Sequence, residues 1–405
     1  MSSPRPTVGD RDRQLDGLRG FAMIGVLIFH ATYFQGAEGL WGRIALTLPS
    51  FMWSGLDLFF LLSGFLITRI LIKHKDATNY FKVFYIRRVA RIFPLYYFLL
   101  FVCFLVVPMF DTGRWNDFWT MPDRGNPWYY WLYVSNWMNA FDGNFRHHFL
   151  SVTWSLSVEE QFYLIWPLVV YRLRTATLGR VCMGLVITAF VLRTVGVLNG
   201  WNPLAIYVLT PMRMDTLLMG GWIAVRAHQD GGFERLFALA RRVGPIAILI
   251  SLSIALAHQI DPTWMMPVPN KLLIHPLMQT VGFTTDVLAY GSLLVWIMTS
   301  EPGGRARRFF ESGFLVAYGK YSYSIYLVHL PVIFFWTFNV QSPADESMPF
   351  VLRQLGRYVF IMIMPMLVAQ ATWRVIEEPL LNLRRYFPYD HGPRSGAGDG
   401  ERAKA

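Results

Sequence analysis

Long apolar segments recur along the whole chain, and they constrain its fold more than any other feature. A helix needs roughly 20 predominantly apolar residues to cross the hydrocarbon core of a bilayer. Candidate spans lie at 17–35, 50–72, 93–110, 153–171, 181–199, 203–225, 243–259, 276–299, 313–339 and 352–376. The sequence therefore predicts an all-α fold, a polytopic transmembrane bundle of about ten spanning helices.

Composition excludes a soluble globular protein. Only 16% of the 405 residues are charged, and the mean hydropathy is +0.34. Most of the net charge of +11 lies in basic segments that follow alternate spans, such as 73–75, 172–174, 241–242, 305–308 and 384–385. The positive-inside rule then places the protein in the cell (inner, cytoplasmic) membrane with both termini on the cytoplasmic side. Topology and lipid contact account for this charge, so nucleic-acid binding is not indicated.

One domain accounts for most of the chain. We expect a disordered N-terminal tail at 1–13, a transmembrane domain at 14–380, and a cytoplasmic, largely disordered tail at 381–405, which is rich in glycine and charge from Pro388 on. The aromatic stretch 128–140 is short and amphiphilic, and is interpreted as interfacial or re-entrant. No metal site is predicted, because His147 and His148 are adjacent in a loop.

Polar residues inside spans are costly and usually mark function. Arg19 and His30 are eleven positions apart in the first span. Eleven helical steps return to within about 20° of the same face, roughly 16 Å further along the axis. The first helix therefore carries a cation at its cytoplasmic mouth and an imidazole on the same stripe. A lone intramembrane histidine could instead serve helix packing through a hydrogen bond.

Four further spans carry ionisable or polar groups near the same depth, roughly 10 Å inside the outer surface by helical rise. These groups are Asp57, Glu159, Glu160, Arg213, Asp215, Ser322, Tyr326 and His329. Their shared depth predicts a common polar cavity. Two alternatives stay open, because Arg213 and Asp215 could neutralise one another, and Tyr326 could anchor the helix at the interface.

Seven sequence stretches carry a family resemblance. They are "LDGLRGFAMIGVLIFHA", "GLDLFFLLSGFLI", "FYIRRVARIFPLY", "TWSLSVEEQFYLIWP", "RMDTLLMGG", "YSYSIYLVHLPV" and "EEPL". In this order they resemble the acyltransferase 3 family of integral-membrane acyltransferases, from Leu15 to Pro379, in the form without an appended soluble esterase-like domain.

The resemblance implies transfer of a short acyl group, often acetyl, from acyl-CoA to a hydroxyl of a sugar, glycolipid, polysaccharide or macrolide-like acceptor. Acyl-CoA would be a donor substrate, and no permanently bound cofactor is expected. The family's motifs fall on Arg19 with His30, on Arg87, Arg88 and Arg91, and on Trp154, Ser155, Leu156 and Glu159.

Physical chemistry suits these roles. Coenzyme A is polyanionic and cytoplasmic, so Arg19, Arg87, Arg88 and Arg91 are predicted to bind the donor, although the cluster at 87–91 could also be a topology anchor. His30 is predicted to act as the base toward the acceptor or as an acyl relay.

The other predicted site residues surround His30. Asp57, in preference to Glu159, would fix the tautomer of His30. Ser63 and Ser155 would be the nucleophiles of a covalent scheme, but both are more typical of helix packing. The residues expected to line the cavity or meet the acceptor are Trp154, Arg213, Asp215, Tyr326 and His329.

A proton-coupled membrane transporter with a midplane polar cavity is the competing interpretation. The absence of a detectable repeat between the two halves argues against it, as does a basic cluster suited to a nucleotide-like donor.

Overall fold

The computed structural model describes residues 12–32, 39–109, 125–260, 275–337 and 349–391. Within these ranges the chain is all-helical and contains no β-strand. The first half contains α1 (Arg13–Ala31), α2 (Gly39–Ala45), α3 (Thr47–Phe51), α4 (Gly55–Lys73), α5 (Tyr80–Phe101), α6 (Val107–Met109), α8 (Trp128–Trp131), α9 (Ser135–Asp142), α10 (Thr153–Arg172) and α11 (Thr175–Leu198). The second half contains α12 (Pro203–Val208), α13 (Thr210–Ala227), α14 (Gly232–Ile260), α15 (Phe283–Thr299), α16 (Arg305–Phe310), α17 (Gly313–Lys320), α18 (Ser322–Phe335), α19 (Phe350–Thr372) and α20 (Glu378–Asn382).

Six helical segments in the described part of the chain are long and apolar enough to cross a membrane. They are Thr47–Lys73, Tyr80–Met109, Thr175–Leu198, Gly232–His258, Met278–Thr299 and Val351–Tyr386. The four other predicted spans coincide with α1, α10, the pair α12 and α13, and the broken pair α17 and α18. These four contain most of the polar residues selected above, which lowers their apolar character. The all-α prediction is confirmed, and the count of about ten spans stays a prediction.

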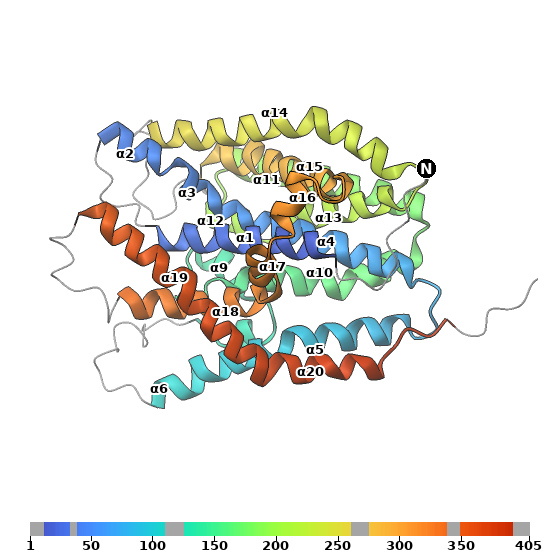
Figure 1. The fold of residues 1–405 in the computed structure, drawn as a ribbon, viewed down its shortest axis with the longest axis horizontal. Coiled ribbons are helices and arrows are strands. Elements are labelled where there is room, and N and C mark those ends of the chain that lie inside the picture. Colours follow the sequence, from blue (N-terminus) through green and yellow to red (C-terminus); the bar gives the residue numbers. More distant parts are fainter. Residues whose placement is uncertain (1–11, 33–38, 110–124, 261–274, 338–348, 392–405) are drawn as a thin grey trace, which may run out of the picture.

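Helix α4 is mostly buried and lies beside α1 in the middle of the bundle, whereas most residues of α11, α14 and α19 are not buried, and α14 lies along one edge of the bundle (Figure 1). An exposed apolar helix face is the expected contact with lipid. The buried helices therefore position the site, and the outer helices shield it from the bilayer.

Two helix crossings depend on glycine. A Cβ atom at Gly20 of α1 would lie 1.9 Å from the carbonyl oxygen of Leu315, and one at Gly319 of α17 would lie 1.8 Å from that of Asp16. A Cβ atom at Gly64 of α4 would likewise lie 1.8 Å from the carbonyl oxygen of Leu217 on α13. Small residues allow such close backbone approach in membrane bundles. The glycines thus fix α17 against α1, and α13 against α4.

Both ends of the described chain lie at one end of the bundle. The Arg69 guanidinium, near the end of α4, binds the Asp12 carboxylate at 2.9 Å. The amide of Thr78, in the loop after α4, donates to the carbonyl of Asp390 at 2.8 Å. This arrangement suits termini on one side of the membrane, and the cytoplasm stays the predicted side.

The aromatic stretch 128–140 contains only two short helices, α8 and α9, separated by Tyr133 with a φ of 54°. Eight residues of helix rise only about 12 Å, so neither helix crosses a bilayer. The interfacial or re-entrant interpretation is consistent with this geometry.

The predicted tail at 381–405 is described as far as residue 391. Residues 381–391 are described: α20 ends at Asn382, a short 3-10 helix follows at Leu383–Tyr386, and the chain then binds the α4–α5 loop. Residues 392–405 lie outside the described residues, as do residues 1–11 of the predicted N-terminal tail. All the glycines of this tail lie in residues 392–405, and residues 381–391 contain none.

Candidate functional site

An elongated pocket of about 330 Å³ lies between α1, α4, α5, α10, α18 and the C-terminal segment. One wall follows α4 from Ile70 to Leu56. That distance is about 21 Å at 1.5 Å of rise per residue. Arg384 and Tyr389 line the pocket at the Ile70 end, and Ser155 and Tyr326 line it as well. The pocket therefore runs from the end of the bundle that holds both described chain ends into its interior.

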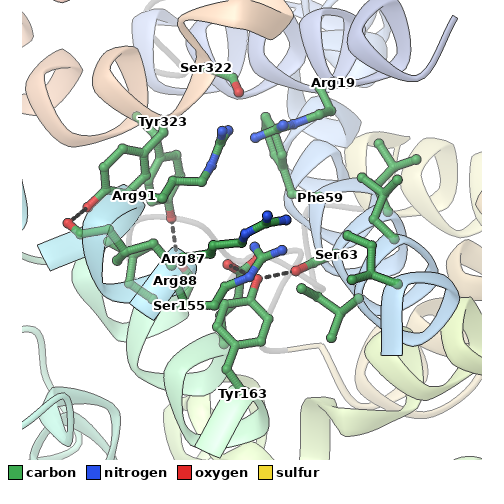
Figure 2. A pocket seen from close by; sticks show the side chains of 18 of the residues that line it. Arg19, Phe59, Ser63, Arg87, Arg88, Arg91, Ser155, Tyr163, Ser322 and Tyr323 are labelled. Carbon is green, nitrogen blue, oxygen red and sulfur yellow. Dashed lines mark hydrogen bonds between the residues drawn. The ribbon is translucent and has the colours of Figure 1, made fainter. Parts of the chain in front are cut away.

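Arginines dominate the polar lining of this pocket. Arg19, Arg87, Arg88 and Arg91 reach into the same space from α1 and α5 (Figure 2). Arg87 and Arg91 are one helical turn apart and share a face of α5. The Arg88 guanidinium lies 5.4 Å from the centroid of the Tyr163 ring. The four predicted donor residues are thus brought together.

Most of this positive charge is uncompensated. Arg19, Arg88 and Arg91 form no hydrogen bond or ion pair with any side chain in the described part of the protein. Among the described residues that line the pocket, Glu159 is the single acidic one, against five arginines when Arg384 is included. Guanidinium groups with free donors in a pocket can bind phosphate or carboxylate oxygens.

A hydrogen-bonded chain of three side chains lies beside these arginines. The Tyr163 hydroxyl donates to Glu159 Oε2 at 2.9 Å, and it also forms a hydrogen bond with Ser63 (Figure 2). Because the tyrosine proton is directed to Glu159, the Ser63 hydroxyl is the donor in the second bond. Glu159 is therefore held by Tyr163.

Ser155 and Tyr326 lie deeper, opposite one another. The Ser155 Oγ and Tyr326 hydroxyl oxygens are 2.6 Å apart, and both hydroxyls lie within hydrogen-bonding distance of the Val152 carbonyl. Beyond the Tyr326 ring lies the His329 imidazole, with 5.6 Å between centroids, and beyond that lies His30, 4.9 Å further between centroids. His30 does not line the pocket. The side chains of Tyr326 and His329 lie between His30 and the pocket.

The two imidazoles are held in the same tautomer. His30 Nδ1 lies 3.0 Å from the carbonyl oxygen of Val26, and His329 Nδ1 lies 2.6 Å from that of Tyr326. A carbonyl oxygen only accepts, so each Nδ1 carries the proton. Each neutral ring then has its lone pair on Nε2. His329 is fully buried, and its Nε2 has no partner in the described part of the chain.

The structure therefore corrects the predicted partner of His30. Neither Asp57 nor Glu159 binds its imidazole; the backbone carbonyl of Val26 does. Asp57 pairs with Arg213 of α13, and both side chains are almost completely buried. A buried guanidinium needs a counter-charge, and α13 crosses α4 where Asp57 is within reach. Asp57 is thereby committed to another cation.

Arg213 and Asp215 do not neutralise one another. Asp215 pairs at 2.7 Å with Arg193 of α11, a fully buried residue that the sequence analysis missed. A lone arginine in the apolar run 181–199 was the available signal. The single predicted cavity is therefore divided: Glu159 and Tyr326 line the pocket, while the two ion pairs form a separate buried cluster.

Trp154 belongs to the border of that cluster. It is 4% exposed, and its ring lies 4.7 Å from that of Tyr207, over which the Arg213 guanidinium is placed at 5.4 Å. It packs between the two regions and does not line the pocket. No group of three potential metal ligands is found among the described residues.

The chain is similar in sequence to known acyltransferases. Residues 12–374 match a family model described as an acyltransferase domain. The chain is 29% identical over 380 residues to the peptidoglycan O-acetyltransferase OatA of Listeria monocytogenes, covering 90% of this chain and 55% of the relative. It is 28% identical over 401 residues to the O-acetyltransferase OatA of Staphylococcus aureus, covering 94% and 58%. A putative peptidoglycan O-acetyltransferase of Bacillus subtilis, YrhL, is 34% identical over 224 residues, covering 52% and 32%.

The chain thus spans little more than half the length of the relatives that it matches most fully. No solved structure matches.

Proposed function

The chain belongs to the membrane acyltransferase family whose model matches residues 12–374, and on this premise we propose that it moves a short acyl group from acyl-CoA to a hydroxyl of a carbohydrate acceptor. Acetyl is the proposed acyl group, and peptidoglycan is the first acceptor to test, because the names of several relatives specify both. The proposed location is the cytoplasmic membrane, with the donor entering from the cytoplasm.

One observation carries the donor assignment: Arg19, Arg88 and Arg91 converge on the pocket without a hydrogen-bond or ion-pair partner in the described part of the chain. Isolated cations in a partly buried pocket are costly unless an anion binds there. Coenzyme A supplies several phosphate charges at one end and a thin, flexible pantetheine arm at the other. That shape fits a pocket with cations along one part and an apolar wall of α4 along its length.

The proposed reaction uses His30 as general base. Its Nε2 accepts the proton of the acceptor hydroxyl, and the alkoxide oxygen attacks the thioester carbonyl. The carbon–sulfur bond then breaks, and the coenzyme A thiolate takes the proton from the imidazolium. The products are an ester and free coenzyme A. The same Nε2 lone pair would serve the alternative relay, in which the acyl group rests on the imidazole before transfer.

The donor assignment is tested by binding of labelled acetyl-CoA to the full chain in nanodiscs. The test variant replaces Arg19, Arg88 and Arg91 by glutamine. The matched control replaces Arg172, Arg180 and Arg242, which are exposed and do not line the pocket. We expect saturable binding that is lost in the test variant and kept in the control. Equal loss in both variants would reduce the interaction to general electrostatics and refute a specific site.

The reaction is tested by transfer of label from acetyl-CoA to peptidoglycan fragments. His30→Gln should bind the donor normally but transfer no label. Acid-quenched wild-type protein, denatured without acceptor, distinguishes the two schemes: label retained on the protein supports the relay, and its absence supports direct transfer. The competing transporter predicts uptake without ester formation, and no observation in the structure favours it over the family match.

A further inference from the structure

Residues 383–391, called the strap here, fold back against the loop between α4 and α5. Asn79 forms a two-sided contact with the strap: its Nδ2 donates to the Pro388 carbonyl at 2.9 Å, and its Oδ1 accepts from the Asp390 amide at 3.0 Å. The Thr78 amide and hydroxyl both donate to the Asp390 carbonyl, at 2.8 and 3.2 Å. These four hydrogen bonds to backbone groups of the strap specify one docked position.

The strap also holds a pocket arginine. Arg87 donates to the Phe387 carbonyl through Nε at 3.1 Å and through Nη2 at 2.8 Å. Its guanidinium lies 5.0 Å from the centroid of the Tyr389 ring, which stacks on the His74 ring at 3.9 Å with 5° between planes. Two hydrogen bonds and a ring contact fix the orientation of Arg87 and leave Nη1 without a partner in the described residues.

The strap contributes lining residues as well. Arg384 and Tyr389 both line the pocket, and Arg384 Nη2 lies 3.4 Å from the carbonyl oxygen of Arg87. Their neighbours in sequence differ: Arg385 and Tyr386 are exposed, do not line the pocket, and contact one another at 2.8 Å. The strap therefore has a pocket side and a solvent side.

We propose that the docked strap completes the phosphate-binding part of the acyl-CoA site, with Arg384 as a direct ligand of the donor's phosphates and Tyr389 as a positioning residue for Arg87. This inference rests on the proposed function. It assigns a binding role to a segment beyond residue 374, where the family match ends. The donor's pantetheine and acyl parts lie deeper in the pocket and do not meet the strap.

The test compares two donors on the full chain in nanodiscs of neutral lipid. Acetyl-CoA carries the nucleotide phosphates, whereas acetyl-pantetheine lacks them. Arg384→Gln is matched by Arg385→Gln, which removes the same charge from the solvent side. Tyr389→Ala is matched by Tyr386→Ala, and Tyr389→Phe keeps the ring.

We expect Arg384→Gln and Tyr389→Ala to weaken acetyl-CoA binding about tenfold, which corresponds to about 1.4 kcal/mol, and to leave acetyl-pantetheine binding unchanged. Tyr389→Phe and the two matched controls should bind both donors as the wild type does. A merely structural role would weaken both donors together, and that result would overturn the inference.

Failure of the inference is distinguishable from failure of the proposed function. If the wild type binds acetyl-CoA and the strap variants match their controls, the strap inference alone is refuted. If the wild type binds neither donor, the donor assignment itself fails. A second series in discs of anionic lipid checks the source of the phosphate. If Arg384→Gln loses acetyl-CoA binding only in these discs, a lipid headgroup is the ligand and the donor role is refuted.

Discussion

The imidazole rings of His30 and His329 lie 4.9 Å apart between centroids and meet at 60°, although 299 positions separate them in sequence. Each ring donates through Nδ1 to a carbonyl of its own helix. The helix thus does for His30 what a carboxylate does in a catalytic triad: it fixes the tautomer. His329 joins the proposed base to Tyr326 at the pocket.

Replacing His329 tests this connection. We expect His329→Gln to lower the rate of acetyl transfer by about 10- to 100-fold, because the ring packs between His30 and Tyr326, while donor affinity stays unchanged. His30→Gln should lower the rate further, by about 10²- to 10⁴-fold. The measurement is kcat for transfer alongside Kd for acetyl-CoA. A His329→Gln protein with wild-type kcat would show that the ring contact has no part in the reaction.

The sequence predicted where helices form more reliably than how they face one another. Each predicted span coincides with helical structure, because apolar length is a local property. The partner of Asp57 could not be predicted, because it depends on how α13 is rotated about its own axis. The depth of a residue in the membrane does not specify that rotation. Arg193 was missed for the same reason, since its counter-charge Asp215 lies on another helix.

Sequence reasoning did find the arginine cluster, because Arg87, Arg88 and Arg91 lie within one helix and Arg19 lies near the start of another. It missed Arg384 and Tyr389, which reach the pocket only through the docked strap. Such contacts join segments 300 residues apart and leave no periodic signal; Arg87 and Phe387 are an example.

The buried pair of Asp57 and Arg213 makes a prediction about stability. Asp57→Asn leaves the Arg213 charge without its counter-charge, so unfolding should become easier by roughly 3–5 kcal/mol. The double variant Asp57→Asn with Arg213→Gln removes both charges and should recover much of that loss. Thermal unfolding of the purified variants in detergent measures both effects. Additive losses in the double variant would contradict a coupled pair.

The crossing of α1 and α17 makes a second stability prediction. Gly319→Ala places a Cβ atom 1.8 Å from the carbonyl oxygen of Asp16, so the two helices must separate. We expect a clear fall in the unfolding temperature and weaker donor binding, because α1 carries Arg19. Gly184→Ala is the matched control, since no atom lies within 4 Å of its Cβ position. The control should be neutral or slightly stabilising, by up to about 1 kcal/mol. Equal behaviour of the two variants would refute the proposed close contact.

Docking of the strap should depend on pH through His74, which follows the last residue of α4. Burial lowers the pKa of His74 to about 4, and the nearby positive charges of Lys73, His391 and Arg87 act in the same direction. The neutral ring stacks on Tyr389, and its Nδ1 lies 3.1 Å from His391 Nε2. In the undocked state the pKa returns toward 6.5, so that state binds more protons between these two values. Docking is therefore strongest above about pH 6.5 and weakens as the pH falls toward 4.

Hydrogen exchange at the Asp390 amide, corrected for intrinsic rates, reports this equilibrium because that amide donates to Asn79 only when the strap is docked. We expect its protection to fall across this pH range in the wild type. His74→Phe keeps a ring against Tyr389 but has no proton to gain, so its protection should stay level between pH 6.5 and 4. A parallel fall in both proteins would show that another group drives the acid response, because only the wild type has a titrating ring at this position.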